Sequence, residues 1–350
     1  MMTRFFILFA WVSFLFGVLL WPKQSFFSQK EENTLHLFSW GSNFDEETIQ
    51  KFENLYNCRV KNHSYASNEE MITKLKATNG KGYDLIMPSD YAVRTLINEG
   101  LIKKLDYSRL NFVERLNPLL LGTEFDPRNK YSLPLQWDVL GLGVDKTRLN
   151  EKNYSWTHVF EKLNYSIVMV NDPVEAVTLA AHFLFGHKET INHQEKNQIR
   201  DLLKEQKRHV EAYVESRPDY LLGTKNCALS VSPASYIWRL EMERNFVQFH
   251  LPSDDLFLLI ENIAIPVGSN KDELIYAFIN YIYEVETLEK TCNEFFFMPP
   301  TFDAIEGLVF KDNMTQLLDD LEKRESKSIH FFRHLLPEKE IRELWIDVKS

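Results

Sequence analysis

The sequence has few cysteines and none of the spacings that bind a structural metal. Cys58, Cys227 and Cys292 lie far apart, with no C-x-x-C pair and no Cys/His cluster, so no structural zinc site is expected. One disulfide stays open, but three small buried hydrophobic side chains are the simpler interpretation. We therefore predict no metal and no cofactor.

Catalytic and nucleotide-binding motifs are also lacking. The chain contains no G-x-S-x-G, H-E-x-x-H, Walker or G-x-G-x-x-G motif, since Gly141-Leu142-Gly143 lacks the third glycine. The histidines are scattered, and His182 and His187 do not have the spacing of ligands on one helical face. We therefore predict that the protein is not an enzyme.

Positive charge is scarce relative to negative charge. The chain carries 40 Lys and Arg against 50 Asp and Glu, a formal net charge of -10. This balance argues against nucleic acid as a partner, because such proteins neutralise phosphates with clustered basic residues. The acidic excess is compatible with a cationic ligand, although a solvated acidic surface is the simpler reason for the charge alone.

Long hydrophobic runs are absent except at the N-terminus. Residues 5–21, FFILFAWVSFLFGVLLW, follow Arg4 and carry no charge. Such a run is typical of a signal peptide and is also at the short limit for a membrane span. We expect residues 1–32 to be either a signal peptide cut near residues 25–28 or a retained inner-membrane anchor. No cysteine follows the run, which disfavours a lipid-modified N-terminus, and one exported body in the periplasm is expected.

The pattern of the first hundred residues indicates a parallel sheet. Strands are predicted at residues 35–40, 58–65 and 83–87, each followed by a helix, the first capped by Asn43. Alternating strands and helices are typical of βαβ units. Ligands bind at the carboxyl ends of such strands, so Trp40 to Asn43 and Ser89 to Tyr91 should line one cleft.

The second half of the sequence predicts another α/β set. An extended apolar stretch at residues 131–144 predicts a crossover between two lobes. Asp172 and Glu175 fall between a strand and a helix, where they either cap the helix or face an ammonium group. Glu261 interrupts an apolar run and either ends a strand or sits in a cleft. Further strands are predicted at residues 165–170, 228–232, 245–250 and 256–265, and helices at 174–185, 188–217, 272–283 and 335–348.

Five segments of the chain carry a family resemblance. They are YASNEEM (65–71), YDLIMPSDYAV (83–93), EGLI (99–102), FDPRNKYSLP (125–134) and IAIP (263–266). In order and spacing they resemble the substrate-binding proteins of spermidine/putrescine ABC transporters, from about Leu35 to the C-terminus and most strongly in the first 140 residues.

The resemblance implies the type II periplasmic-binding-protein fold. This is an α/β fold of two lobes, each a mainly parallel sheet flanked by helices, joined by crossover hinge strands. The lobes would be residues 33–138 plus 260–306, and 139–259 plus 307–350.

The resemblance also implies a binding site. In this family carboxylates hold ammonium groups and aromatic rings cover methylenes. The matching residues here are Trp40, Ser89, Tyr91, Asp172, Glu175 and Glu261, the last in place of an aspartate. Weaker matches are Ser42 and Asn43 at acidic and tyrosine positions, Ser232 and Leu259 at tryptophan positions, and Phe297 at a tyrosine position. The acidic residues persist while much of the aromatic box is missing, and Trp137, Phe257 and Trp238 are candidates to replace it.

The function implied by the resemblance is transport. A monomeric exported protein would capture a polyamine in the interlobe cleft and deliver it to the permease and ATPase of an ABC importer. Two alternatives stay open. One is the same fold with another ligand, such as another organic cation, iron or an anion, although the carboxylates would oppose an anion. The other is a sensor or interaction protein, favoured if residues 5–21 remain as a membrane anchor.

Overall fold

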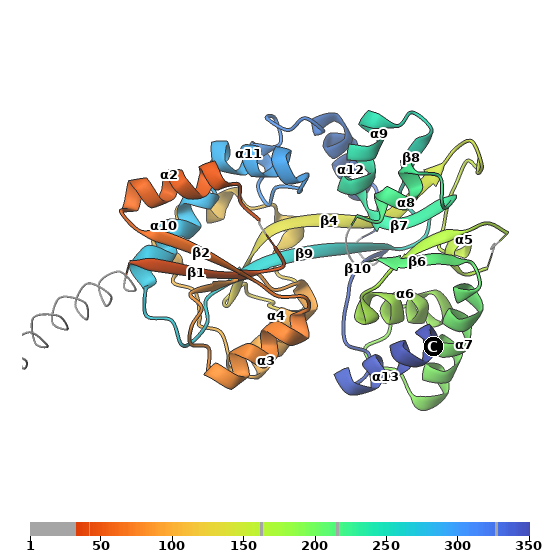
Figure 1. Ribbon diagram of the computed structural model, residues 1–350, viewed down its shortest axis with the longest axis horizontal. Coiled ribbons are helices and arrows are strands. Elements are labelled where there is room, and N and C mark those ends of the chain that lie inside the picture. The colour runs from red at the N-terminus through yellow and green to blue at the C-terminus, as the bar shows by residue number, and fades with distance from the viewer. Residues whose placement is uncertain (1–32, 42, 162–163, 215–216, 326–327) are drawn as a thin grey trace, which may run out of the picture.

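The protein folds into two lobes that lie side by side (Figure 1). The computed structural model describes residues 33–350 except 42, 162–163, 215–216 and 326–327. The predicted signal peptide or anchor, residues 1–32, lies outside this part. Among the described helices none is both long and apolar enough to cross a membrane.

The first lobe confirms the predicted strand–helix repeats. Strand β1 (Thr34–Ser39) pairs in parallel with β2 (Arg59–Ser64) and β3 (Leu85–Ile86). The helices are α2 (Glu46–Tyr56), α3 (Asn68–Thr78) and α4 (Asp90–Asn98), with α10 (Asp272–Ile282) and α11 (Val285–Phe295) added from later in the chain. Asn43 is not the cap of α2. Asp45 is, because its carboxylate accepts the Thr48 amide at 3.0 Å.

The second lobe contains most of the remaining elements. Its strands are β5 (Ile167–Val170), β6 (Val210–Val214), β7 (Leu229–Pro233), β8 (Val247–His250) and β10 (Ile329–Phe331). Its helices are α5 (Thr157–Phe160), α6 (Pro173–Phe185), α7 (His193–Lys207), α8 (Asp219–Gly223), α9 (Ala234–Glu243) and α13 (Glu338–Lys349), and α12 (Lys311–Glu322) lies beside α9. The prediction of one helix over 188–217 is wrong. Residues 210–214 pair in parallel with β5 instead, since their hydrophobic side chains extend the sheet.

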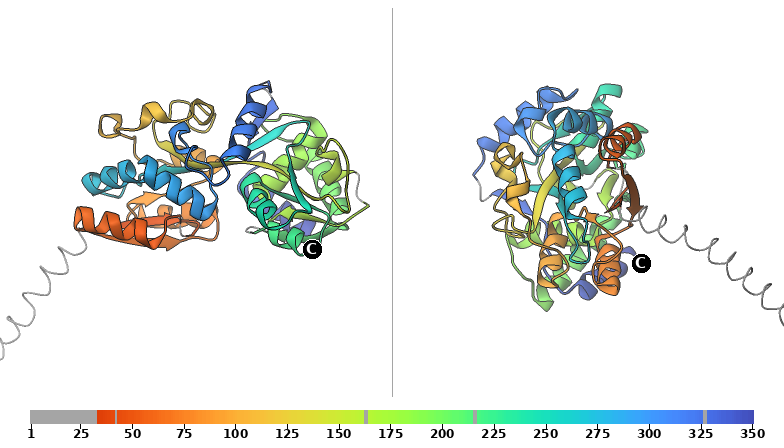
Figure 2. Two further views of the ribbon diagram at one scale, coloured as in Figure 1. Left: turned by 90° about the horizontal axis from the view of Figure 1, so that it is seen from above. Right: turned by 90° about the vertical axis from the view of Figure 1, so that its left-hand side faces the viewer.

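Two long antiparallel strands connect the lobes. Strand β4 (Ser132–Asp145) and strand β9 (Leu256–Ala264) pair along most of their length. The strand order is β2-β1-β3-β9-β4-β7-β5-β6, with β8 on β4 and β10 on β9. The crossover predicted at residues 131–144 is therefore confirmed, and the view from above shows the lobes joined at these strands (Figure 2, left). The proposed lobe limits at 138/139 and 259/260 fall inside β4 and β9, and the limit at 306/307 falls before α12. All three stay a prediction.

The three cysteines are buried and unpaired. Cys58 and Cys292 belong to apolar clusters of the first lobe and of the region around α12, and Cys227 to one in the second lobe. Burial raises the pKa of each thiol, to about 11 for Cys58 and about 12 for Cys227. They therefore pack as small hydrophobic side chains.

Candidate functional site

A cavity of about 540 Å³ lies between the two lobes. Its walls come from the ends of β1 and β5, the starts of α3, α6 and α9, and the middle of β4 and β9. This volume falls in the range of sites for small organic ligands. The predicted placement of a cleft at strand ends therefore matches a real cavity.

Carboxylates dominate the charged groups of this cavity. Its lining includes Glu69, Asp138, Asp172, Glu175 and Glu261, and no Lys, Arg or His among the residues that the structure describes. Buried like charges raise one another's free energy, so unpaired carboxylates in a shared cavity favour a cation.

Asp172 both caps α6 and lines the cavity. Its Oδ1 accepts the amides of Val174 at 2.7 Å and Glu175 at 2.9 Å. Burial raises the pKa of Asp172 to about 6, despite hydrogen bonds that lower it. Burial and the Asp172 charge raise the pKa of Glu175 well above its usual value. The capping interpretation of Asp172 is therefore confirmed. Asp172 also faces the cavity, and its contact with a ligand stays a prediction.

Tyr91 lies behind Asp172 and does not line the cavity. It is buried, and its hydroxyl donates to Oδ2 of Asp172 at 2.8 Å while accepting from Asn68 at 2.8 Å. This hydrogen bond joins α4 of the first lobe to α6 of the second. Tyr91 thus contacts the Asp172 carboxylate, and the expected contact between Tyr91 and a ligand stays a prediction.

Glu261 faces the cavity from β9, next to Ser89. The Ser89 hydroxyl donates to Oε1 of Glu261 at 2.6 Å. Burial raises the pKa of Glu261 to about 8, while Ser89 and the Trp40 indole lower it. The second oxygen, Oε2, is buried and has no hydrogen bond of normal length and angle to any residue that the structure describes. That oxygen can accept a hydrogen bond from a bound donor.

Asp138 also lines the cavity and was not among the predicted residues. It lies on β4 and accepts amide hydrogen bonds from Val139 at 2.7 Å and Ala234 at 2.9 Å, and one from the Ser235 hydroxyl. Burial raises its pKa to about 7. The sequence did contain a signal for this position, because Asp138 interrupts an apolar run as Glu261 does. Alternation along β4 places Gln136, Asp138 and Leu140 on the side of the strand that faces the cavity.

The aromatic wall differs in part from the expected one. Trp40 is 36% exposed, and its ring lies 5.0 Å from that of Tyr65. Trp137 lines the cavity, but only 2% of it is exposed and its indole donates to the Pro299 carbonyl. Tyr236, in the first turn of α9, was not predicted and also lines it. Asn43, Leu259 and Phe297 are in the lining as expected, whereas Phe257 and Trp238 are not.

Ser232, a weaker candidate, is not among the residues that line the cavity. Ser232 is fully buried in β7, where its hydroxyl donates to the Pro233 carbonyl at 3.1 Å. The next residue, Pro233, lines the cavity and Ser232 does not, as expected because side chains alternate along a strand. Ser42 lies outside the described residues.

Sequence and structure comparisons agree on one group of proteins. Residues 47–316 match the bacterial extracellular solute-binding protein family. The chain is 28% identical over 343 residues to the putrescine/cadaverine-binding protein of Pseudomonas aeruginosa, covering 90% of this chain and 93% of that protein. It is 25% identical over 278 residues to the spermidine/putrescine-binding periplasmic protein of Escherichia coli K12, covering 78% and 79%. A solved structure of a putative spermidine/putrescine ABC transporter from Listeria monocytogenes superposes with a TM-score of 0.79 at 26% identity, covering 91% of this chain and 99% of that one.

Proposed function

Because the chain belongs to the family of bacterial extracellular solute-binding proteins, we propose that it captures a polyamine between its lobes and delivers it to an ABC importer. The observation that carries this proposal is a cavity of about 540 Å³ whose described charged side chains are all carboxylates. The names of its relatives support the same ligand class. The protein would act in the periplasm, after export directed by residues 1–32.

The cavity has the two kinds of surface that a polyamine needs. Such a ligand is a chain of methylenes with protonated amines at intervals. Asp172 and Glu175 would hold one ammonium group, and Glu261 with Ser89 another. Each charge-assisted hydrogen bond contributes roughly 1.5–3 kcal/mol. Trp40 and Tyr236 would cover the methylenes and add cation–π contacts of about 0.5–2 kcal/mol.

Capture would couple to closure of the lobes. Strands β4 and β9 form the connection about which the lobes can rotate. The Tyr91–Asp172 hydrogen bond joins the two lobes beside the cavity at 2.8 Å. A ligand that bridges the lobes stabilises the closed form, which the transporter would recognise. Other ligand classes fit less well, since the carboxylates oppose an anion and a bare iron ion would leave most of the volume unfilled.

Isothermal titration calorimetry tests the proposal directly. The protein beginning at Asn33 would be titrated with putrescine, cadaverine, spermidine, spermine, agmatine and arginine, with phosphate and ferric citrate as controls. We expect saturable one-to-one binding of at least one polyamine, weakened by added salt because the attraction is between charges. Binding of phosphate or ferric citrate with no binding of any amine would contradict the proposed function.

Trp40→Ala should weaken polyamine binding by roughly 5- to 150-fold, about 1–3 kcal/mol, because it removes one aromatic face. Trp40→Phe is the matched control. It keeps a ring but loses the indole N–H that lowers the pKa of Glu261, so its loss should be smaller. Calorimetry of both variants separates ring contact from the N–H contribution, and unchanged affinity in Trp40→Ala would exclude Trp40 from the site.

A further inference from the structure

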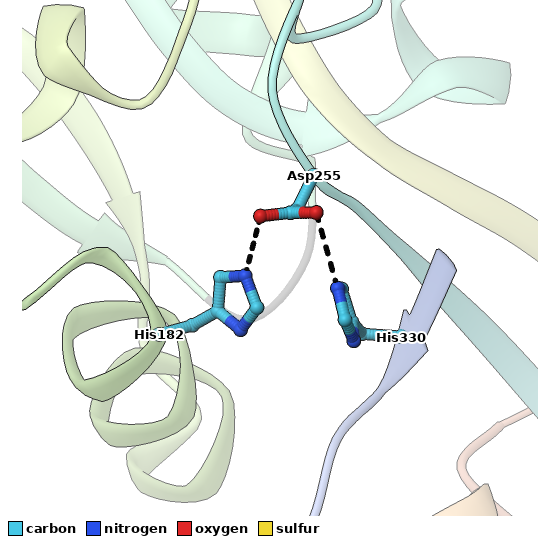
Figure 3. Close-up of side chains that lie close together, drawn as sticks. All are labelled: His182, Asp255 and His330. Atoms are coloured by element: carbon cyan, nitrogen blue, oxygen red, sulfur yellow. Dashed lines mark hydrogen bonds and ion pairs between the residues drawn. The ribbon is translucent and has the colours of Figure 1, made fainter. Parts of the chain in front are cut away.

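Three side chains converge outside the cleft, at the other end of α6 (Figure 3). They are His182 near the end of α6, Asp255 just before β9, and His330 of β10. His182 Nε2 lies 2.7 Å from one oxygen of Asp255, and His330 Nε2 lies 3.2 Å from the other. We propose that His182, Asp255 and His330 form a binding site for a divalent transition-metal ion of the zinc type.

The donor atoms are of the right kind and closely grouped. Two imidazole nitrogens and a carboxylate oxygen lie within 4.8 Å of one another. Tetrahedral zinc takes such ligands at about 2.0–2.2 Å, so the donors end up roughly 3–3.5 Å apart and need only small shifts. Calcium and magnesium prefer all-oxygen sites, which this set does not provide.

The surroundings of the two imidazoles leave room for one small occupant. A small cavity of about 10 Å³ is lined by His182, His187 and His330, enough for roughly one water-sized occupant. The rings of His187 and His330 stack with centroids 5.5 Å apart, but His187 is not among the converging donors, so water would complete the coordination. The side chain of Asp255 is 37% exposed, which gives an ion a path from solvent.

The positive side chains near the proposed site are paired with carboxylates, so they should not repel a bound cation. Lys188 and Arg333 also line the small cavity. Lys188 pairs with Glu195 at 2.8 Å, and Arg333 pairs with Glu189 at 2.6 Å and with Glu124. Their charges are therefore largely balanced by glutamates, and Asp255 is left to face the two imidazoles.

A bound ion would join three segments that are far apart in sequence. It would tie β10, and with it the C-terminal segment that ends in α13, to α6 and the start of β9. His182 is ten residues along the chain from Asp172, roughly 15 Å at the helical rise. The site is therefore separate from the polyamine cleft, and its test does not depend on the proposed function.

Zinc and cobalt binding test the site. The untagged full-length chain in mild detergent, and in parallel the protein beginning at Asn33, would be freed of metal with a chelator and titrated with zinc chloride. We expect one equivalent to bind, a melting temperature raised by roughly 5 °C at a hundred-fold excess over Kd, and visible absorption bands from bound Co²⁺. His330→Ala and Asp255→Asn should each lose at least roughly 100-fold in zinc affinity, because each removes a direct ligand.

Matched variants distinguish a metal site from a cluster held by hydrogen bonds alone. His193→Ala, at an exposed histidine on α7, should bind zinc like the parent protein. Asp172→Asn with Glu175→Gln should also keep zinc binding, which excludes the cleft carboxylates. His330→Gln, checked for its metal-free melting temperature and unchanged polyamine affinity, guards against misfolding. If the parent protein binds zinc no better than a folded His182→Ala/His330→Gln variant, Asp255 merely bridges two imidazole N–H groups and the metal site is refuted.

Discussion

Replacing Asp172 with Asn and Glu175 with Gln together should weaken polyamine binding by about 10²–10⁴-fold. The change removes two carboxylates that would hold one ammonium group, at roughly 1.5–3 kcal/mol for each charge-assisted hydrogen bond. Asn caps a helix about as well as Asp, and its amide oxygen can still accept from Val174 and Glu175. Helix α6 should therefore persist. Calorimetry with the preferred polyamine at pH 7.5 and low salt would measure the loss.

Asp45→Asn is the matched control for this variant. Asp45 caps α2 as Asp172 caps α6, accepting the Thr48 amide at 3.0 Å, but it does not line the cavity. Its substitution repeats the chemical change at a helix N-terminus away from the ligand, and polyamine affinity should stay within about two-fold of the parent. If the Asp172/Glu175 variant is folded and binds as tightly as Asp45→Asn, the carboxylates of α6 do not hold the ligand.

The cavity-lining residues that could be predicted from the sequence lie at the ends of strands and helices. Trp40 follows β1, Ser89 precedes α4, and Asp172 and Glu175 begin α6. The strand–helix pattern fixes such positions, because the ends of parallel strands meet at one edge of a sheet. Tyr91 lay in the same segment, yet helical geometry turns its ring into the core, and only its hydroxyl reaches Asp172.

Residues whose role depends on packing between distant segments could not be predicted. Tyr236 reaches the cavity because β7 ends at Pro233 and α9 turns toward the cleft. His182 and His330 are separated by well over a hundred residues, and their sequence spacing carries no ligand signal. Asp138 was detectable as a charge inside an apolar strand, but which face of β4 meets the cleft depends on its pairing with β9. Pairing register between distant strands is a tertiary property.

Polyamine affinity should rise by about 10²–10³-fold between pH 6 and pH 8. Burial raises the pKa of Asp172 to about 6, of Asp138 to about 7 and of Glu261 to about 8. Below these values the carboxyls are protonated and neutral, so each must lose its proton before it can pair with an ammonium group, at up to ten-fold in affinity per pH unit. The ligand amines, with pKa values near that of lysine at roughly 10, stay charged over this range. Calorimetry in buffers of different ionisation enthalpy would measure both the affinity and the protons released.

The free protein should show the opposite trend in stability, which gives a second readout of the same groups. A carboxyl whose pKa is raised by folding stabilises the folded state below its unfolded pKa, near 4, and loses that contribution as pH rises through its folded value. The free protein should thus lose this contribution between about pH 4 and pH 8, and the rise in melting temperature caused by ligand should grow over the same interval.

The Glu261→Gln variant lacks the carboxyl that titrates near the upper end of this interval. The polyamine affinity of this variant should therefore change only about ten-fold between pH 6 and pH 8. Its stability without ligand should also depend less on pH. Affinity that is flat or falls over this range would mean that the cleft carboxylates are already ionised, or that they do not contact the ligand.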